Sequence, residues 1–248
     1  MKLAFVVPAF NEEALIGGCL ESIRAEIQRA GVAADTEIIV VDNASTDATG
    51  AVASAVPGVR VVREPKKGLV NARAAGLAAT QAELVANIDA DTRLPPGWLT
   101  TVLDAFAASP RLVVLSGPFV YTDLTPAQRL VTKCFYGAGY AIHAVFGRLL
   151  KKGAMVQGGN FVLKREAWLS VGGFDQSIAF YGEDTDVANR LAPVGEVRWT
   201  FDLPIHASGR RLAAEGVVAT GARYALNYFW VTLFGHPISR AYRDIRPS

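Results

Sequence analysis

The chain has 248 residues, of which 51% are hydrophobic and 19% are charged, and its formal net charge at pH 7 is +2. This apolar content is enough for one large domain with a substantial core, and it argues against a disordered or low-complexity chain. The net charge is mild and no dense basic run stands beside interleaved aromatic residues, so a nucleic-acid partner is not expected.

Neither a secretion signal nor a membrane span is expected from the apolar segments. Residues 3–7 are too few for the apolar region of a signal peptide, and Pro8 follows them. No stretch reaches the ~20 apolar residues that a membrane-spanning helix needs. Cys19 and Cys134 lie far apart in helical patterns, so neither a disulfide nor a zinc site is expected. A cytoplasmic location fits these features, with peripheral contact to the cytoplasmic face of a membrane as an option.

Apolar runs of strand length alternate with helical patterns through the first half of the chain. Strands are expected at residues 3–7, 38–41, 59–62 and 84–88, and helices at residues 11–27, 46–55, 69–79 and 96–108. This alternation is typical of β-α-β units, whose crossovers are right-handed. It predicts an α/β fold with a mostly parallel central sheet that is flanked by helices.

Polar residues mark the expected starts of these helices. Asn11 is the expected N-cap of the first helix, which puts Glu12 and Glu13 in the first turn, where the helix dipole stabilises acidic side chains. Pro96 is expected in the first turn of the fourth helix, where its missing N–H group is not needed. For the second helix, Asp47 fits a capping role better than Asp42 does.

The second half of the chain is less regular. A strand is expected through residues 112–120, a long aromatic helix at about 126–150, a short strand at 160–163 and a helix that ends near residue 191. No internal repeat and no Ser-, Pro- or Gly-rich linker separates these segments, so one domain is expected. Residues 206–248 are expected to form a C-terminal extension.

Two carboxylates stand two residues apart where the fourth expected strand ends. Asp89 and Asp91 point the same way in extended backbone, so both can address one ligand. Adjacent anions repel each other unless a cation sits between them, and Mg²⁺ or Mn²⁺ bridging to a diphosphate meets that need. Alternatively, the pair caps the following loop. Polar residues also follow the first two strands, and in an open parallel sheet these strand ends lie along one edge, where ligands bind.

Four motifs together resemble the family 2 glycosyltransferases, which have the GT-A fold. They are residues 7–13 (VPAFNEE), 41–47 (VDNASTD), 89–91 (DAD) and 182–186 (GEDTD). The resemblance covers residues 1 to about 192. It implies an inverting transferase that moves a sugar from a nucleotide-diphosphate sugar, with UDP preferred, to a hydroxyl group of a lipid or glycan acceptor. It also implies a divalent metal, Mn²⁺ or Mg²⁺, and a place in glycolipid, cell-envelope or polysaccharide synthesis.

The resemblance also implies roles for residues of the donor half, residues 1–92. The loop that contacts the nucleoside is matched by Pro8, Ala9, Asn11 and Glu12. Asp42 matches the carboxylate that reads the base, Arg73 an arginine of the base pocket, Asp89 a group that faces the ribose, and Asp91 a metal ligand. Two alternatives stay open: Asp42 could cap the following helix, and Arg73 could lie on a solvated helix face.

Residues 93–205 would form the catalytic and acceptor half. Asp184 is the expected base that removes the proton of the acceptor hydroxyl, with Glu183 orienting it or binding the acceptor. Alternatively, these acids enrich the first turn of a helix. Gly159 and Asn160 would bring backbone close to the donor sugar, because glycine presents no side chain. The same residues could equally form a tight turn into a strand.

The C-terminal extension begins with a histidine and two nearby arginines. The resemblance implies that His206 completes the metal site with Asp89 and Asp91, and that Arg210 and Arg211 clamp the diphosphate. A lone histidine can also be structural. The basic, aromatic and aliphatic residues of segments 129–152 and 223–246 could lie on an anionic membrane, pack in the core or form a homodimer.

Other functions remain as alternatives to the transferase. A sugar-nucleotide-binding protein of the same fold without turnover is one, and a nucleotidyltransferase that makes sugar nucleotides is another. The nucleotidyltransferase would need a glycine-rich, Arg-containing loop after the first strand, whereas residues 8–13 read PAFNEE. A dinucleotide oxidoreductase is not expected, because the G-x-G-x-x-G pattern is missing.

Overall fold

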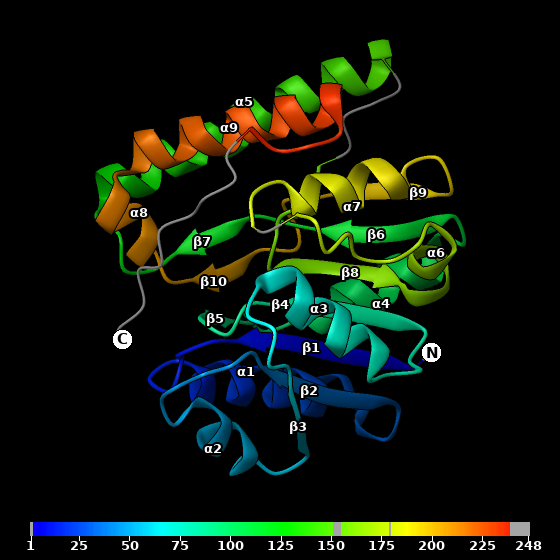
Figure 1. Ribbon diagram of the computed structural model, residues 1–248. Helices are drawn as coiled ribbons and strands as arrows, with labels where there is room; N and C mark the ends of the chain where they lie inside the picture. Colours follow the sequence, from blue (N-terminus) through cyan, green and yellow to red (C-terminus); the bar gives the residue numbers. More distant parts are fainter. Residues whose placement is uncertain (1, 151–154, 179, 239–248) are drawn as a thin grey trace.

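A computed structural model describes residues 2–150, 155–178 and 180–238 (Figure 1). Its core is a seven-stranded sheet with the strand order β3-β2-β1-β4-β8-β6-β9. The strands are β1 (Leu3–Ala9), β2 (Thr36–Asp42), β3 (Val59–Arg63), β4 (Leu84–Ile88), β6 (Leu112–Ser116), β8 (Asn160–Lys164) and β9 (Glu196–Trp199). Neighbours are parallel except that β8 is antiparallel to both β4 and β6. The predicted α/β fold with a mostly parallel central sheet is confirmed.

Helices cover both faces of this sheet. One face packs against α1 (Ile16–Ala30), α2 (Thr49–Ser54) and α4 (Trp98–Ala108). The other face packs against α3 (Leu69–Ala78), α6 (Arg165–Ser170) and α7 (Glu183–Leu191). Every residue of β1 and β4 is buried, as expected for central strands that are covered on both sides. A short 3₁₀ helix, η1 (Ala33–Asp35), leads from α1 into β2.

A second, three-stranded sheet lies beside the carboxyl end of β4. It contains β5 (Thr92–Arg93), β10 (Ile205–Ala207) and β7 (Phe119–Tyr121), in the order β5-β10-β7. The chain then forms α8 (Arg210–Glu215) and α9 (Val217–Phe234), and α9 packs against α5 (Pro126–Leu150) and α7. Helices α5 and α9 run side by side at the side of the molecule farthest from α2 (Figure 1). The described part of the predicted C-terminal extension, residues 206–238, is thus built into the fold around the strand ends.

The helix starts predicted from Asn11 and Pro96 are wrong. Helix α1 begins at Ile16, and Asn11 stands before it with a left-handed backbone (φ 50°). Helix α4 begins at Trp98, after Gly97, whose φ of 90° is readily adopted by glycine. Both predictions took the start of the helix from one favourable residue. Contacts with other segments compete with that preference: the Asn11 side chain accepts from the Thr46 N–H, and the Leu99 N–H in the first turn of α4 donates to Glu26 of α1.

The predicted single strand over residues 112–120 is divided at Gly117 and Pro118. Its first part, β6, belongs to the large sheet, and its second part, β7, belongs to the small one. A β-carbon on Gly117 would overlap the backbone carbonyl of Leu203, and Pro118 has no N–H group to donate to a strand neighbour. This break moves the chain from one sheet to the other.

Both cysteines are free thiols in helices. Cys19 is buried in α1, and Cys134 is exposed on α5. Burial raises the pKa of the Cys19 thiol to about 12, so this thiol stays protonated and unreactive at neutral pH. Within the residues that the structure describes, no helix has both the length and the hydropathy needed to cross a bilayer.

Candidate active site

The loops after β1 and β2 are hydrogen-bonded into one unit. The Asn11 side-chain oxygen accepts from the backbone N–H of Thr46 at 2.9 Å, and the Asn11 N–H donates to the Ser45 hydroxyl at 3.2 Å. Within the described ranges, Asn11 and Ala44 are the non-glycine residues with positive φ, at 50° and 61°. Such backbone persists only where its surroundings fix it, and it gathers at functional sites. These loops therefore form a preorganised edge beyond the two strands.

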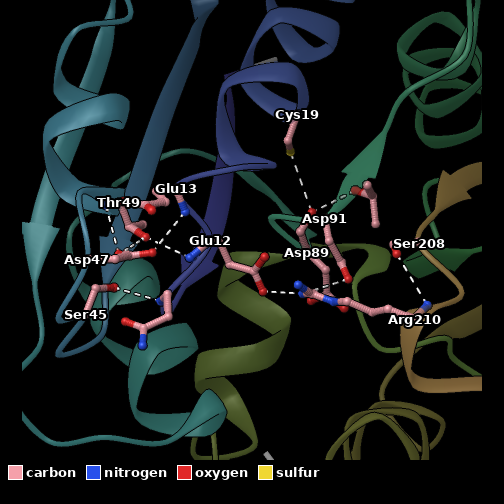
Figure 2. Close-up of polar contacts among 12 residues, drawn as sticks. Glu12, Glu13, Cys19, Ser45, Asp47, Thr49, Asp89, Asp91, Ser208 and Arg210 are labelled. Carbon is pink, nitrogen blue, oxygen red and sulfur yellow. Dashed lines mark hydrogen bonds and ion pairs between the residues drawn. The ribbon is translucent and has the colours of Figure 1, made fainter. Parts of the chain in front are cut away.

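Asp47, and not Asp42, holds the start of α2. Its carboxylate accepts from the backbone N–H of Thr49 at 2.9 Å and from that of Glu13 at 3.2 Å (Figure 2). Although its slight burial acts in the opposite direction, these hydrogen bonds lower the pKa of Asp47. Asp42 ends β2 and accepts from the Ser45 N–H at 3.1 Å. The capping alternative for Asp42 is thereby removed.

Arg73 on α3 is buried, so the solvated-face alternative is wrong. Its side chain is 1% exposed and contacts two carboxylates, Glu183 at the start of α7 and Asp89 at the end of β4, the latter at 3.2 Å. Burial alone would lower the pKa of the guanidinium, but the charges of Glu183 and Asp89 raise it above its usual value. One fixed positive charge therefore joins the carboxylates of two motifs.

Glu183 and Asp184 begin α7, directly after Gly182, whose φ is 84°. Burial raises the pKa of the Glu183 carboxyl to about 7, although the Arg73 charge opposes the rise. The Asp184 carboxylate accepts from the N–H groups of Gly158 at 3.1 Å and Thr185 at 2.8 Å. Burial raises its pKa above the ordinary aspartate value, even though these hydrogen bonds act in the opposite direction. A buried carboxylate with a raised pKa is a competent proton acceptor.

Two glycines allow these carboxylates to approach one another. A β-carbon on Gly159, whose φ is 82°, would overlap the Asp89 carboxyl group. A β-carbon on Gly158 would lie 2.9 Å from a Glu183 oxygen. The backbone of these glycines thus lies close to the carboxylates of Asp89 and Glu183. The predicted approach of this backbone to the donor sugar stays a prediction.

The Asn160 side chain is hydrogen-bonded to other groups of the protein. Its oxygen accepts from the Trp98 indole N–H at 3.1 Å, and its amide donates to the carbonyls of Gly117 at 3.0 Å and Leu203 at 2.9 Å. The residue is fully buried. Asn160 thus joins the start of β8 to Gly117, where the chain passes from one sheet to the other, and so positions Gly159.

Arg210 reaches the carboxylates from the C-terminal segment. Its guanidinium contacts Glu12 and lies 3.0 Å from Asp91 (Figure 2). The Ser208 N–H donates to the Asp91 carbonyl at 3.2 Å. Arg211 points elsewhere, pairing with Glu215 at 3.1 Å. Of the two arginines predicted to hold the diphosphate, Arg210 therefore lies beside the carboxylates of Glu12 and Asp91, whereas Arg211 is engaged by Glu215.

Comparison with known sequences places the chain in a family. The glycosyl transferase family 2 profile matches residues 4–169, more than half of the chain. The chain belongs to glycosyl transferase family 2. A glucosyl-dolichyl phosphate glucuronosyltransferase of Haloferax volcanii is 27% identical over 131 residues, which are 53% of this chain and 42% of that protein. An uncharacterized glycosyltransferase of Mycobacterium bovis is 42% identical over 94 residues, 38% of each chain. The family 2 chain spans less than half the length of these relatives.

Solved structures share the fold of this family 2 protein. A mannosyltransferase from Pyrobaculum calidifontis, in complex with GDP-Man and Mn²⁺, has a TM-score of 0.72 and 21% identity, over 94% of this chain and 64% of that one. Glucosyl-3-phosphoglycerate synthase from Mycobacterium tuberculosis, in complex with Mn²⁺, UDP and phosphoglyceric acid, has a TM-score of 0.62 and 23% identity, over 96% and 80%. These likenesses confirm the GT-A fold that the motifs implied.

The predicted metal set of Asp89, Asp91 and His206 is not assembled in this family 2 protein. Strand alternation in β10 buries Ile205 and Ala207 and leaves His206 exposed, and no three His, Cys, Asp or Glu residues in the described ranges group closely enough to hold an ion. The side chains of Asp89 and Asp91 are 31% and 21% exposed. Their oxygens suit an ion that takes other ligands from a diphosphate and water, as Mg²⁺ does. The residues fit such an ion.

Two tyrosines near Asp184 were missed from the sequence. Burial and the Asp184 charge raise the pKa of Tyr228, on α9, to about 12. Tyr136, on α5, has its pKa raised to about 12 chiefly by burial, and its hydroxyl donates to the Gln157 side chain at 2.9 Å. The sequence predicted membrane, core or dimer roles for segments 129–152 and 223–246, and no local signal distinguishes Tyr136 and Tyr228 from the other tyrosines of these segments.

An open depression of about 690 Å³ lies away from these carboxylates. It is lined by residues 81–83, 164–167, 169 and 170 and by Val194. Residues 81–83 precede β4, and Lys164 ends the antiparallel β8, so the depression lies at the opposite edge of the sheet from Asp89. Its lining lacks the convergent acids found at the other edge, and geometry and charge therefore favour the carboxylate edge as the active site.

Proposed function

We propose that this protein is an inverting glycosyltransferase that moves a sugar from a nucleotide-diphosphate sugar to an acceptor hydroxyl. One observation carries the proposal: the buried Arg73 joins Asp89 to Glu183, which directly precedes Asp184. The donor-side and acceptor-side motifs therefore meet at one edge of the sheet. In this proposal residues 1–92 hold the donor, residues 93–205 supply the base, and the segment from 206 contributes Arg210.

On the donor side, the fixed loops after β1 and β2 bind the nucleoside. Asp42, at the end of β2, accepts hydrogen bonds from the base or ribose. Asp91 and Asp89 are the residues that would hold Mn²⁺ or Mg²⁺, and the bound ion would neutralise the charge of the departing diphosphate. Arg210 stands beside Asp91 and provides a second positive charge for the phosphates.

On the acceptor side, Asp184 takes the proton of the incoming hydroxyl group. The acceptor oxygen forms a bond to the anomeric carbon as the bond from that carbon to the diphosphate oxygen breaks, and the proton moves to an Asp184 carboxylate oxygen. The Gly158 and Thr185 N–H groups fix the orientation of this carboxylate. Attack opposite to the leaving group inverts the anomeric configuration.

A thermal-shift screen with donor nucleotides tests the proposal and selects the base. The solved neighbours carry GDP-Man or UDP together with Mn²⁺, so UDP, GDP and dTDP sugars are the probes. A ligand that binds the native state raises the unfolding temperature. We expect one nucleotide series to do so in the presence of Mn²⁺. No shift from any series would contradict the proposal, and binding without transfer to any acceptor would instead support a binding protein.

Replacing Asp91 by asparagine is expected to abolish the Mn²⁺-dependent part of donor binding. The amide loses the negative charge that a divalent ion requires. Isothermal titration with the nucleotide selected above, with and without Mn²⁺, measures the effect. Asp104→Asn is the matched control, because Asp104 is exposed on α4. Unchanged Mn²⁺-dependent affinity in Asp91→Asn would remove Asp91 from the metal site.

Transfer activity is expected to fall on the acid side with an apparent pKa above 3.8, the ordinary aspartate value. The base works only when it is unprotonated, and burial raises the pKa of Asp184. The rate therefore increases with pH through the raised pKa. A profile of kcat/KM from pH 4 to 8 checks this expectation. A rate that stays flat down to pH 4 would contradict it.

A further inference from the structure

Helix α9 exposes apolar side chains on its outer side. Its buried side carries Thr220 and Asn227 together with Val217 and Val231. On the opposite face Val218, Leu226 and Leu233 are 66%, 59% and 65% exposed. A surface helix of a globular protein normally packs its apolar stripe on the core and shows its polar side to water. The exposed apolar side chains indicate that the outer side of α9 is suited to an apolar environment.

The outer face of α9 is continuous. Val218, Ala222, Leu226 and Leu233 are exposed and are separated by four, four and seven residues, which places them along one side of a helix. Arg223 is the charged residue of α9, and it pairs with Glu215 at 2.8 Å. The outer face itself carries no charge over its whole length.

Helix α5 brings exposed positive charge next to α9. It lies alongside α9 (Figure 1), and Leu130 on it is 63% exposed. Arg129 and Lys133 beside Leu130 are exposed as well. Neither α5 nor α9 contains an aspartate or a glutamate. Apolar residues that are flanked by Arg and Lys without acids are the pattern of helices that lie in the interface of an anionic membrane.

We propose that the α5/α9 face, defined by Leu130, Val218, Leu226 and Leu233 with Arg129 and Lys133, docks on an anionic lipid surface. Anionic headgroups complement the two cations, and the apolar side chains enter the acyl boundary. A second copy of the chain fits less well, because a two-fold contact through this face would enclose the cations of both copies, and neither α5 nor α9 has an acidic residue to pair with them. Lipid is therefore the partner that both the charge and the apolar area favour.

Helix α9 lies between this face and the proposed catalytic base. The inner side of α9 packs on α7, where Val231 lies against Gly182, two residues before Asp184. One helix, about 10 Å across, thus separates the lipid-facing side chains from the proposed base. The acceptor class follows if the proposed function holds: the hydroxyl belongs to a lipid-linked molecule and reaches Asp184 at the level of the headgroups.

Co-sedimentation with vesicles tests the docking in the absence of donor and acceptor. The probes are phosphatidylcholine vesicles and phosphatidylcholine vesicles containing phosphatidylglycerol. We expect binding to the mixed vesicles, weaker binding to the neutral ones, and loss of the difference at high salt, where charges are screened. Failure of the full chain to bind the mixed vesicles would overturn the inference.

Paired variants locate the docking surface. Leu226→Ser/Leu233→Ser is expected to reduce partitioning by about tenfold or more, because two exposed leucines no longer enter the lipid. Leu169→Ser/Val194→Ser is the matched control, since these two residues are 46% and 50% exposed away from the face. Arg129→Gln/Lys133→Gln should weaken binding to anionic vesicles alone. Equal partitioning of the two serine variants, or a dimer in sedimentation equilibrium that dissociates in Leu226→Ser/Leu233→Ser, would overturn the proposal.

A donor-binding readout separates this inference from the proposed function. The thermal shift given by nucleotide sugar and Mn²⁺ should be the same in Leu226→Ser/Leu233→Ser as in the wild type, which also shows that the variant is folded. If the wild type shows this thermal shift but does not bind the mixed vesicles, the docking surface is wrong and the proposed transferase function still stands. If the wild type binds the mixed vesicles but shows no thermal shift with any nucleotide sugar, the docking surface stands and the proposed function is contradicted.

Discussion

Asp184→Asn is expected to lower the rate of sugar transfer by about 10²- to 10⁴-fold, the range that a general base contributes. Asparagine has nearly the same shape as aspartate and still accepts one of the hydrogen bonds from Gly158 and Thr185, but it cannot take the acceptor proton. Donor binding should stay within about twofold, because Asp184 acts in the transfer step. Steady-state transfer rates and calorimetric donor affinity measure the two effects.

The control for this variant lies on the same helix. Asp186 pairs with Arg190 at 3.0 Å, four residues along α7, so Asp186→Asn changes a carboxylate of α7 without touching the proposed base. It should keep most of the transfer activity. Full activity in Asp184→Asn, or an equal loss in both variants, would show that the acidic first turn of α7 is structural.

Arg73→Met is expected to lower the free energy of unfolding by about 3–5 kcal/mol, because removing one partner of a buried ion pair leaves an uncompensated charge. Arg73 is 1% exposed, and the side chain of Glu183 is 6% exposed. Chemical denaturation of the wild type and variant gives the difference. The double variant Arg73→Met/Glu183→Gln should recover part of the loss, since it removes the stranded carboxylate as well.

The pH dependence of stability separates this explanation from simple loss of packing. The folded-state pKa of Glu183 is raised to about 7 from 4.5, so the folded protein binds the extra proton between these values and stability falls as the pH rises through that range. The positive charge of Arg73 limits this rise in the pKa of Glu183. In Arg73→Met the pKa should rise further and the loss of stability should continue above pH 7. Parallel pH profiles of the two proteins would contradict the proposed pairing.

The sequence predicted the first half of the fold because the signals there are local. Strands β1, β2, β3 and β4 are short apolar runs between turn residues, and every residue of β1 and β4 is buried. Motif spacing then placed Asp89 and Asp91 at a strand end. Parallel strands bring their carboxyl ends to one edge, so the location of the site followed from the order of the elements.

The remaining features depend on contacts between distant residues. Asn11 does not cap α1, because its side chain is used by Thr46 of the next loop. Arg210 meets Glu12 across 198 residues of sequence, and no local pattern indicates such a pairing. The burial of Arg73 could not be predicted from the sequence either, because its carboxylate partners come from other elements. Such contacts arise from tertiary packing, which overrides local preference.

Anomalous diffraction at the manganese edge tests the central claim most directly. Crystals would be soaked with Mn²⁺ and the nucleotide diphosphate that gives the largest thermal shift. The proposed function predicts a manganese peak beside the Asp91 carboxylate, with the diphosphate bound to the same ion and the Asp184 carboxylate facing the space beyond it. A peak at another place on the molecule, or a nucleotide bound away from Asp42 and Asp91, would contradict the assignment of this edge as the active site.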